Sequence, residues 1–434
     1  MTRTPSRAGG ANNAELIELF PETAAVEDGE LVIGGVRACA LAEEFGTPLV
    51  VYCRDTVLAC ARAYARVDPD VLVVYGTKAF PNVALLQLLV AAGLGADVST
   101  AGELAFALRA GVPADRLVFH GNNKSDEELQ RAARAGALIV LDALEEVERA
   151  AAAGARAVLV RVTPGVEAET HRSIRTAHAG SKFGLSPEDS VTAVHLAGSA
   201  GLDVAGLHVH VGSQLARVDQ SLLAVDRLVD VARRCRAELG WTPRLFDLGG
   251  GAGVRQSLSE AFPDPEAFAR ALVLRLRDRW PEPVRVLLEP GRSLVGRAGL
   301  TLYRAGVVKA TGGVTYVAVD GGMSDNPRPQ LYGSRYDAML ANRAEETAKG
   351  KYRIAGKHCE SGDVLIESVE LPGPRRGDLI AVPATGAYTL AMASNYNGVP
   401  RPAAVLVGEG KAELIRRRES LDDLLAHDVF PGRN

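Results

Sequence analysis

The chain has 434 residues, a length that predicts two or three domains, or one large barrel with a smaller domain. Hydrophobic residues make up 47% and charged residues 24%, as in ordinary soluble enzymes. The net charge of −4 and the lack of a long apolar run exclude nucleic acid and membrane as expected partners. The five cysteines are scattered and odd in number, which favours a reducing cytoplasm over a disulfide framework or a metal cluster.

Residues 1–14 are small, polar and loosely basic, and predict a disordered tail without the apolar core of a signal peptide. From residue 55 to 293, short apolar runs alternate with amphipathic segments, which is typical of repeated βα units. Eight strands are predicted, at 71–75, 95–98, 116–120, 138–142, 157–162, 204–211, 244–249 and 284–289. Continuous apolar strands suit a parallel sheet covered on both faces, so we expect a closed (β/α)₈ barrel, with an open doubly wound sheet as the alternative.

The two ends of the chain have a different pattern. Residues 15–54 and 294–434 contain short β-like runs separated by glycine and proline, and predict one mostly β domain built from both termini. Helices near 387–394 and 420–427 are also expected. Residues 166–182, rich in small and polar residues, are a candidate lid.

Polar or glycine residues end nearly every predicted barrel strand. Functional residues of such barrels lie at the C-terminal ends of the strands, so this concentration predicts a site. The residues delivered there are Lys78, Asp97, His120, Asp142, Arg161, His208, His210, Gly249–Gly251, Glu289, Gly291 and Arg292.

The glycine run and Arg292 follow the seventh and eighth strands, where this fold most often binds phosphate. Glycines let backbone N–H groups approach an anion, and an arginine adds a charged donor fork. A flexible turn is the alternative for the glycines alone. A phosphate corner, a lysine and an acidic residue in one barrel mouth suggest pyridoxal 5'-phosphate, with Lys78 as the amine that reacts with its aldehyde and Glu289 as the partner of its ring nitrogen. Either His208 or His210 is expected to face the cofactor.

The motifs YGTKAF, GADVSTAGEL, FHGNNKSDEEL, GLHVHVGSQL, LGGGAGV, EPGRSLV, NPRPQLYG, CESGD and ATGAYTL occur here in one order. With these motifs in this order, the chain resembles the meso-diaminopimelate decarboxylases, which belong to the same group as the ornithine and arginine decarboxylases. The resemblance covers residues 30–425 and implies an alanine-racemase-like barrel that binds pyridoxal phosphate.

The resemblance also implies roles for single residues. Lys78 would carry the cofactor, His210 would stack on its ring, and Glu289 would face the ring nitrogen. The other cofactor-binding residues would be Asp97, Arg161, Ser213, Gly249, Gly250, Gly251, Gly291, Arg292 and Tyr388. The substrate would contact Arg292, Arg328, Tyr332, Glu360 and Tyr388.

Cys359 resembles the acid that returns a proton after CO₂ leaves, and a thiol with an ordinary pKa of about 8.5 is protonated at neutral pH. A small buried hydrophobe is the default reading of a lone cysteine, but its polar neighbours argue against a core position. In the family this segment completes the site of the other subunit, which implies a homodimer with shared active sites. Another basic amino acid, such as ornithine, arginine or a carboxylated polyamine, is the alternative substrate.

Overall fold

The computed structural model describes residues 13–166 and 180–429 of the chain. Two compact units make up the fold: one holds residues 57–254 and 261–295, the other residues 1–56, 255–260 and 296–434. We call them the barrel unit and the β unit. The predicted boundaries were 55 and 293. The predicted tail lies outside the described residues except for residues 13 and 14, and so does most of the predicted lid.

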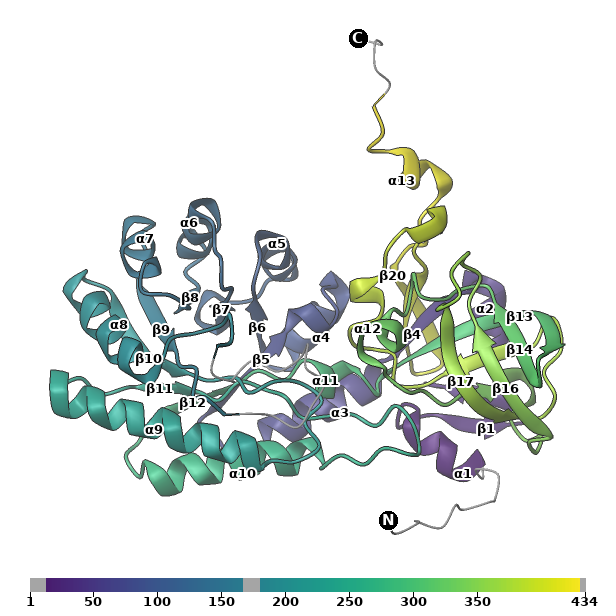
Figure 1. Ribbon diagram of the computed structural model, residues 1–434, viewed down its shortest axis with the longest axis horizontal. Helices are drawn as coiled ribbons and strands as arrows, with labels where there is room; N and C mark the ends of the chain where they lie inside the picture. Colours follow the sequence, from purple (N-terminus) through teal and green to yellow (C-terminus); the bar gives the residue numbers. More distant parts are fainter. Residues whose placement is uncertain (1–12, 167–179, 430–434) are drawn as a thin grey trace. The chain divides into compact units, whose positions relative to one another are not determined.

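The barrel unit is a closed ring of eight parallel strands, which confirms the predicted fold (Figure 1). The strands are β5 (Val71–Gly76), β6 (Gly95–Val98), β7 (Leu117–Phe119), β8 (Leu138–Leu141), β9 (Ala157–Arg161), β10 (Asp203–His208), β11 (Leu245–Asp247) and β12 (Arg285–Leu288). The ring closes where β12 pairs with β5, with Val286 opposite Val71.

Helices follow the strands and form the outside of the barrel unit (Figure 1). They are α4 (Val83–Ala91), α5 (Ala101–Ala110), α6 (Asp126–Arg134), α7 (Glu146–Ala152), α8 (Pro187–Ser199), α9 (Asp219–Leu239), α10 (Pro265–Arg279) and the short α11 (Arg292–Val295). Helix α3 (Arg54–Ala65) precedes β5. Local sequence sets several helix starts: Ser125 and Glu128 form a capping box on α6, and Ser186 caps α8 just before a proline at its first position.

The barrel interior contains a layer made of one buried apolar side chain from each of six strands. These are Val74, Val118, Val140, Leu159, Leu245 and Leu287, all buried. Such a layer makes the barrel a packed core, so polar groups are left to the strand ends.

The β unit is built from both ends of the chain, as expected. Its main sheet runs in the order β17-β16-β14-β13-β4-β19-β20, with β18 attached to β13 and β15 attached to β18, and a small separate sheet holds β1, β2 and β3. The strands are β1 (Ala25–Glu27), β2 (Glu30–Ile33), β3 (Val36–Arg37), β4 (Leu49–Cys53), β13 (Gly299–Thr311), β14 (Val314–Val319), β15 (Met339–Leu340), β16 (Gly350–Ala355), β17 (Val364–Leu371), β18 (Leu379–Val382), β19 (Ala403–Gly408) and β20 (Lys411–Arg416).

The helices of the β unit are short. They are α1 (Asn13–Leu16), α2 (Ala38–Phe45), α12 (Arg328–Tyr332) and α13 (Leu421–Leu425). The helix predicted near 387–394 is wrong, since only a 3₁₀ turn at Leu390–Met392 forms there. The cause is local: Tyr388 has a φ of 58°, a left-handed conformation that no α-helix accepts.

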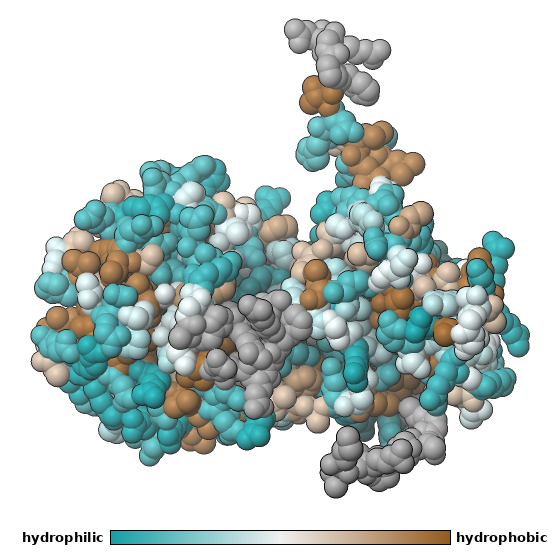
Figure 2. Space-filling model, viewed as in Figure 1, coloured by the Kyte–Doolittle hydropathy of each residue, from teal (hydrophilic) through white to brown (hydrophobic). Residues whose placement is uncertain are grey.

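On the face seen in Figure 2, hydrophobic residues are interspersed among hydrophilic ones in both units. Within the described ranges, no helix combines the length and the apolar character that crossing a membrane requires.

Candidate active site

Lys78 and Asp97 form an ion pair at the ends of β5 and β6. Lys78 lies in a 3₁₀ turn directly after β5, and its Nζ is 2.8 Å from Asp97 Oδ2. The lysine side chain is 47% exposed while the aspartate side chain is 1% exposed. The fold therefore buries the carboxylate and leaves the amine accessible, which is the arrangement a reactive amine needs.

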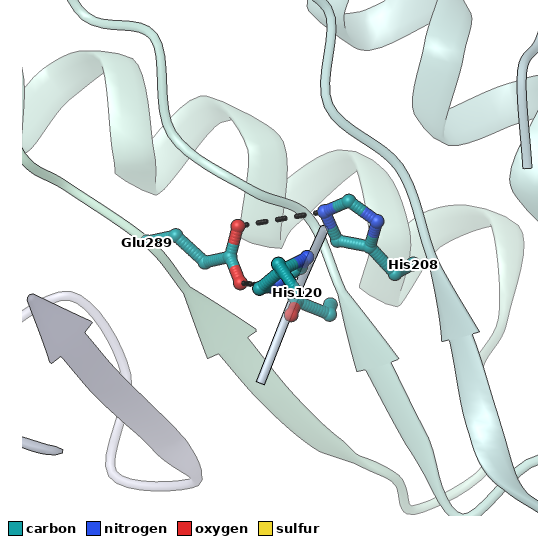
Figure 3. A group of neighbouring side chains, drawn as sticks. His120, His208 and Glu289 are labelled. Carbon is teal, nitrogen blue, oxygen red and sulfur yellow. Dashed lines mark hydrogen bonds and ion pairs between the residues drawn. The ribbon is translucent and has the colours of Figure 1, made fainter. Parts of the chain in front are cut away.

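Glu289 follows β12 and is buried between two histidines (Figure 3). His120 Nε2 is 2.5 Å from Glu289 Oε1, and His208 Nε2 is 3.4 Å from Glu289 Oε2. Burial alone would raise the pKa of Glu289, but His120 and His208 outweigh it and hold that pKa well below its usual value. Glu289 is therefore an ionised carboxylate inside the barrel.

Asp247, the last residue of β11, is the fourth member of this cluster. Its Oδ1 accepts the Gly249 N–H at 2.9 Å, and its side chain is fully buried. Burial and the nearby Glu289 raise the pKa of Asp247 well above its usual value. Two adjacent carboxyls cannot both ionise cheaply, so Asp247 keeps the proton and Glu289 keeps the charge.

Of the residues predicted to bind phosphate, Arg292 and Ser213 contact each other, whereas the glycine run contacts other residues. Arg292 donates from Nε and Nη2 to Ser213 Oγ, at 3.4 and 3.3 Å. Two glycine N–H groups are engaged within the protein, Gly249 with Asp247 and Gly250 with His210 Nδ1 at 3.3 Å. The glycine run packs tightly, since a Cβ at Gly250 would lie 2.3 Å from the Glu289 carbonyl oxygen. The glycine run is therefore a closely packed segment, in which a side chain would collide with backbone.

His208 and His210 have different surroundings, because β10 ends at His208 and not at residue 211 as predicted. His208 faces Glu289, and burial lowers its pKa to about 4. His210 lies beside the glycine run, and burial, Lys78 and Arg161 lower its pKa well below its usual value. Both imidazoles are therefore neutral at neutral pH.

Arg161 belongs to a second buried charge network at the ends of β7, β8 and β9. Its Nη1 lies 3.3 Å from Asp142 Oδ2, whose Oδ1 accepts the Gly184 N–H at 2.6 Å. Lys124 and Glu146 add another buried pair at 3.0 Å, and the Asp142 N–H donates to Glu146. These ion pairs link the ends of three neighbouring strands, close enough to Asp97 for its charge to act on Arg161, so the network stabilises this part of the rim.

Gly291 lies close to the lysine strand. The Gly76 N–H bonds to the Pro290 carbonyl, and a Cβ on Gly76 would lie 3.4 Å from the Gly291 Cα.

In the β unit, Cys359 is exposed and its loop is held at several points. The Cys359 N–H donates to Asn397 Oδ1 at 2.9 Å, and Tyr396 OH donates to Glu360 Oε2 at 3.3 Å. His358 is buried beneath them, 2.7 Å from Asp363 Oδ2, and its ring stacks on Tyr396. An exposed thiol on an anchored backbone is suited to donating a proton at a defined position.

Arg328 and Tyr332 also meet in the β unit, at the two ends of α12. The Arg328 guanidinium lies over the Tyr332 ring, 5.3 Å from its centre, and Nη2 donates to Ser334 Oγ at 3.0 Å. The predicted site residues thus form two groups, one at the barrel rim and one in the β unit, where Tyr388 has its left-handed backbone.

Sequence reasoning gave no role to His120 or Asp142, although it placed them at strand ends, and it missed Asp247 and Asn397. It gave His208 only as the alternative to His210 for facing the cofactor. Asp247 carried one signal, an acidic residue inside an otherwise apolar predicted strand. Nothing local distinguishes Asn397, which contacts a loop 38 residues away.

The residues at the barrel rim fit a pyridoxal phosphate. An accessible amine, an ionised buried carboxylate and an arginine–serine corner correspond to its aldehyde, its ring nitrogen and its phosphate.

Comparison with known proteins gives the same answer. Residues 54–296 match the family described as "Pyridoxal-dependent decarboxylase, pyridoxal binding domain". The diaminopimelate decarboxylase of Actinosynnema pretiosum subsp. auranticum is 44% identical over 95% of both chains, and that of Bacillus subtilis is 40% identical over 93% of this chain and 96% of its own. The crystal structure of the M. jannaschii diaminopimelate decarboxylase with L-lysine superposes with a TM-score of 0.88 at 32% identity, over 94% of this chain and 98% of that one. The resemblance inferred from the motifs is confirmed, and the chain belongs to the pyridoxal-dependent decarboxylases and, within them, to the diaminopimelate decarboxylase family.

Proposed function

We propose that the chain removes CO₂ from meso-2,6-diaminopimelate to give L-lysine, the last step of bacterial lysine biosynthesis, and that it works in the cytoplasm. The names of its relatives and the lysine bound in the M. jannaschii structure support this substrate over ornithine, arginine or a carboxylated polyamine.

The observation that carries the substrate assignment is Arg328. Arg328 is 2% exposed. Its Nη2 donates a hydrogen bond to the neutral hydroxyl of Ser334, and its Nε has no hydrogen-bond partner among the described residues. A buried guanidinium that contacts a hydroxyl and a tyrosine ring, with the Glu260 carboxylate acting on it at longer range, is costly unless a closer anion joins it. Diaminopimelate has a second carboxylate at its distal end, whereas ornithine ends in a single ammonium group.

At the barrel rim, Lys78 would bind the cofactor aldehyde and Glu289 would keep the ring nitrogen protonated. Arg292, Ser213 and the glycine run would hold the phosphate, and the neutral His210 would stack on the ring. When bound, the cofactor supplies an electron sink for the pair left at Cα.

The remaining steps belong to this chain's own residues. Asp97 holds the ammonium of Lys78 when the amine is free. Cys359 would donate its thiol proton to Cα on the side opposite the departing carboxylate, and Glu360 would take the distal ammonium. The association of Cys359 with Lys78 comes from the family resemblance.

We also propose a homodimer in which Cys359 and Glu360 serve the partner's Lys78. Three apolar residues spaced four apart near the C-terminal end support an interface there. They are Leu421 and Leu425 on α13 and Val429 beyond it, and they are 69%, 62% and 86% exposed. Figure 2 shows hydrophobic side chains at α13. Such residues are stabilised by covering them with another protein surface.

Turnover measured on diaminopimelate, ornithine and arginine tests the substrate. We expect kcat/KM for diaminopimelate to exceed the others by about 100-fold or more, since buried polar groups reject substrates that leave them unpaired. Arg328→Gln should lower kcat/KM for diaminopimelate by roughly 30-fold or more. Arg335→Gln, an exposed neighbour, is the matched control and should change little. A preference for ornithine would contradict the proposal.

A further inference from the structure

His120 lies between two carboxylates that come from different strands of the barrel. It follows β7, where its backbone N–H bonds to the Val98 carbonyl at 2.7 Å, and its side chain is 8% exposed. Its Nε2 is 2.5 Å from Glu289 Oε1 and 3.8 Å from Asp97 Oδ1. One ring nitrogen therefore faces both acids of the rim.

These contacts join into one chain of charges. Asp97 Oδ2 binds the Lys78 ammonium, while Asp97 Oδ1 is buried and makes no hydrogen bond among the described residues. The groups run in the order Lys78, Asp97, His120, Glu289. The first is the amine for the cofactor aldehyde and the last is the carboxylate for its ring nitrogen.

His120 is better placed for this link than the other histidine at Glu289. The His208 ring lies edge-on to the His120 ring at 4.8 Å, and its Nε2 stays 3.4 Å from Glu289 (Figure 3). Neither ring nitrogen of His208 makes a hydrogen bond within the described part of the chain. Only the shorter His120 contact has the geometry of a strong charge-assisted bond.

We propose that His120 is a positioning residue which donates its Nε2–H to Glu289 and, through Asp97, links the charge at Lys78 to the charge at the ring-nitrogen carboxylate. The inference rests on the proposed function, because it assumes that Lys78 and Glu289 hold the two ends of the cofactor. The titratable groups that face His120 are Asp97 from β6, His208 from β10, Asp247 from β11 and Glu289 after β12.

The direct test compares enzymes loaded with pyridoxal phosphate. His120→Leu should lose the cofactor about 10- to 100-fold faster in dialysis, because Glu289 would be left with an unmet buried charge. The same variant should shift the pH midpoint of the cofactor's visible absorbance by about one unit. His120→Gln, whose amide can still donate to Glu289, should recover most of both effects. The control His195→Gln, exposed on α8, should match the wild type.

A second measurement does not depend on the stability of the leucine variant. In the loaded enzyme labelled with ¹⁵N-histidine, Glu289→Gln should shift the His120 Nε2 resonance and leave that of His195 unchanged. An unshifted His120 resonance, or a leucine variant with wild-type retention and pH midpoint, would overturn the inference. Enzyme that shows the expected shifts but ignores diaminopimelate would contradict the proposed function and leave the role of His120 standing.

Discussion

At the scale of single residues, the fold exposes the groups proposed to react with substrate or cofactor and buries the carboxylates proposed to control their charge. Lys78 is half exposed and Cys359 is exposed, whereas Asp97 and Glu289 are buried. A buried carboxylate exerts its charge through a medium that screens it little, so it acts strongly on an amine at 2.8 Å. The two residues proposed to react, Lys78 and Cys359, are thus accessible, whereas the carboxylates that set the electrostatics of the barrel rim are buried.

Replacing Cys359 with alanine tests the proposed proton donor. Loss of a positioned general acid lowers rates by about 10²- to 10⁴-fold, so we expect kcat to fall by that range while the cofactor's visible absorbance persists. The absorbance should persist because Cys359 lies outside the barrel unit that carries Lys78.

Cys39→Ala is the matched control, since Cys39 is half-buried on α2 and has no proposed role. Its turnover should equal that of the wild type. Full turnover in Cys359→Ala would refute the assignment of the acid.

At the scale of elements, the segment after β11 shows why three glycines occur in a row. A Cβ would lie 2.7 Å from the Val209 carbonyl at Gly249, 2.3 Å from that of Glu289 at Gly250, and 2.6 Å from that of Gly212 at Gly251. Each contact involves backbone, which cannot rotate away as a side chain can. The close packing therefore fixes Glu289 and His210 relative to each other.

Gly250→Ala should accordingly weaken cofactor retention by about 10-fold or more and lower the melting temperature, since overpacking costs roughly 1–3 kcal/mol. Dialysis of the loaded enzyme and thermal unfolding measure the two effects. Gly198→Ala is the control: Gly198 lies inside α8 with no atom within 4 Å of the new Cβ, so it should keep the cofactor and gain up to about 1 kcal/mol of stability. Equal behaviour of the two variants would contradict the packing argument.

The elements differ in how far sequence could predict them. All eight barrel strands were predicted, because apolar runs bounded by glycine and polar residues are a local signal. Strand β10 ends three residues early, and this separates His208 from His210. The cluster of His120, His208, Asp247 and Glu289 needs the closed ring, since four strands must converge before the side chains meet. The residue pattern within a single strand cannot predict that side chains from four strands will meet.

At the scale of the whole molecule, each unit has its own core and its own buried charges. In the β unit, Asp325 is buried, accepts hydrogen bonds from the Tyr303 hydroxyl and from the Gly322 N–H, and has Asp320 and Asp363 nearby. Burial, the largest cause, raises its pKa to about 7. The acid is therefore protonated in the folded chain at a pH where the unfolded chain has already released the proton.

The contribution of Asp325 to the free energy of unfolding should therefore fall as pH rises from about 4 to 7 and level off above that. The raised pKa of Asp325 corresponds to roughly 4 kcal/mol over this window. Denaturant unfolding of the wild type and of Asp325→Asn should differ by this slope across the window, because the other groups that titrate there, His208 and His210 among them, are the same in both proteins. Asp422→Asn, exposed on α13, should keep it. A wild-type slope in Asp325→Asn would contradict the raised pKa.

Subunit mixing tests whether two chains share their active sites. Lys78→Ala and Cys359→Ala homodimers should each be inactive, yet a mixed dimer with shared sites contains one site with both intact residues. Random exchange makes half of the dimers mixed, each with one working site of two, so activity should return to about a quarter of the wild-type value. If each site were built from a single chain, mixing would restore nothing, because every chain carries one defect. Sedimentation of the same mixtures should show dimers throughout, and recovery should follow the rate of subunit exchange. Recovery without exchange, or dimers that exchange without recovery, would contradict the shared site.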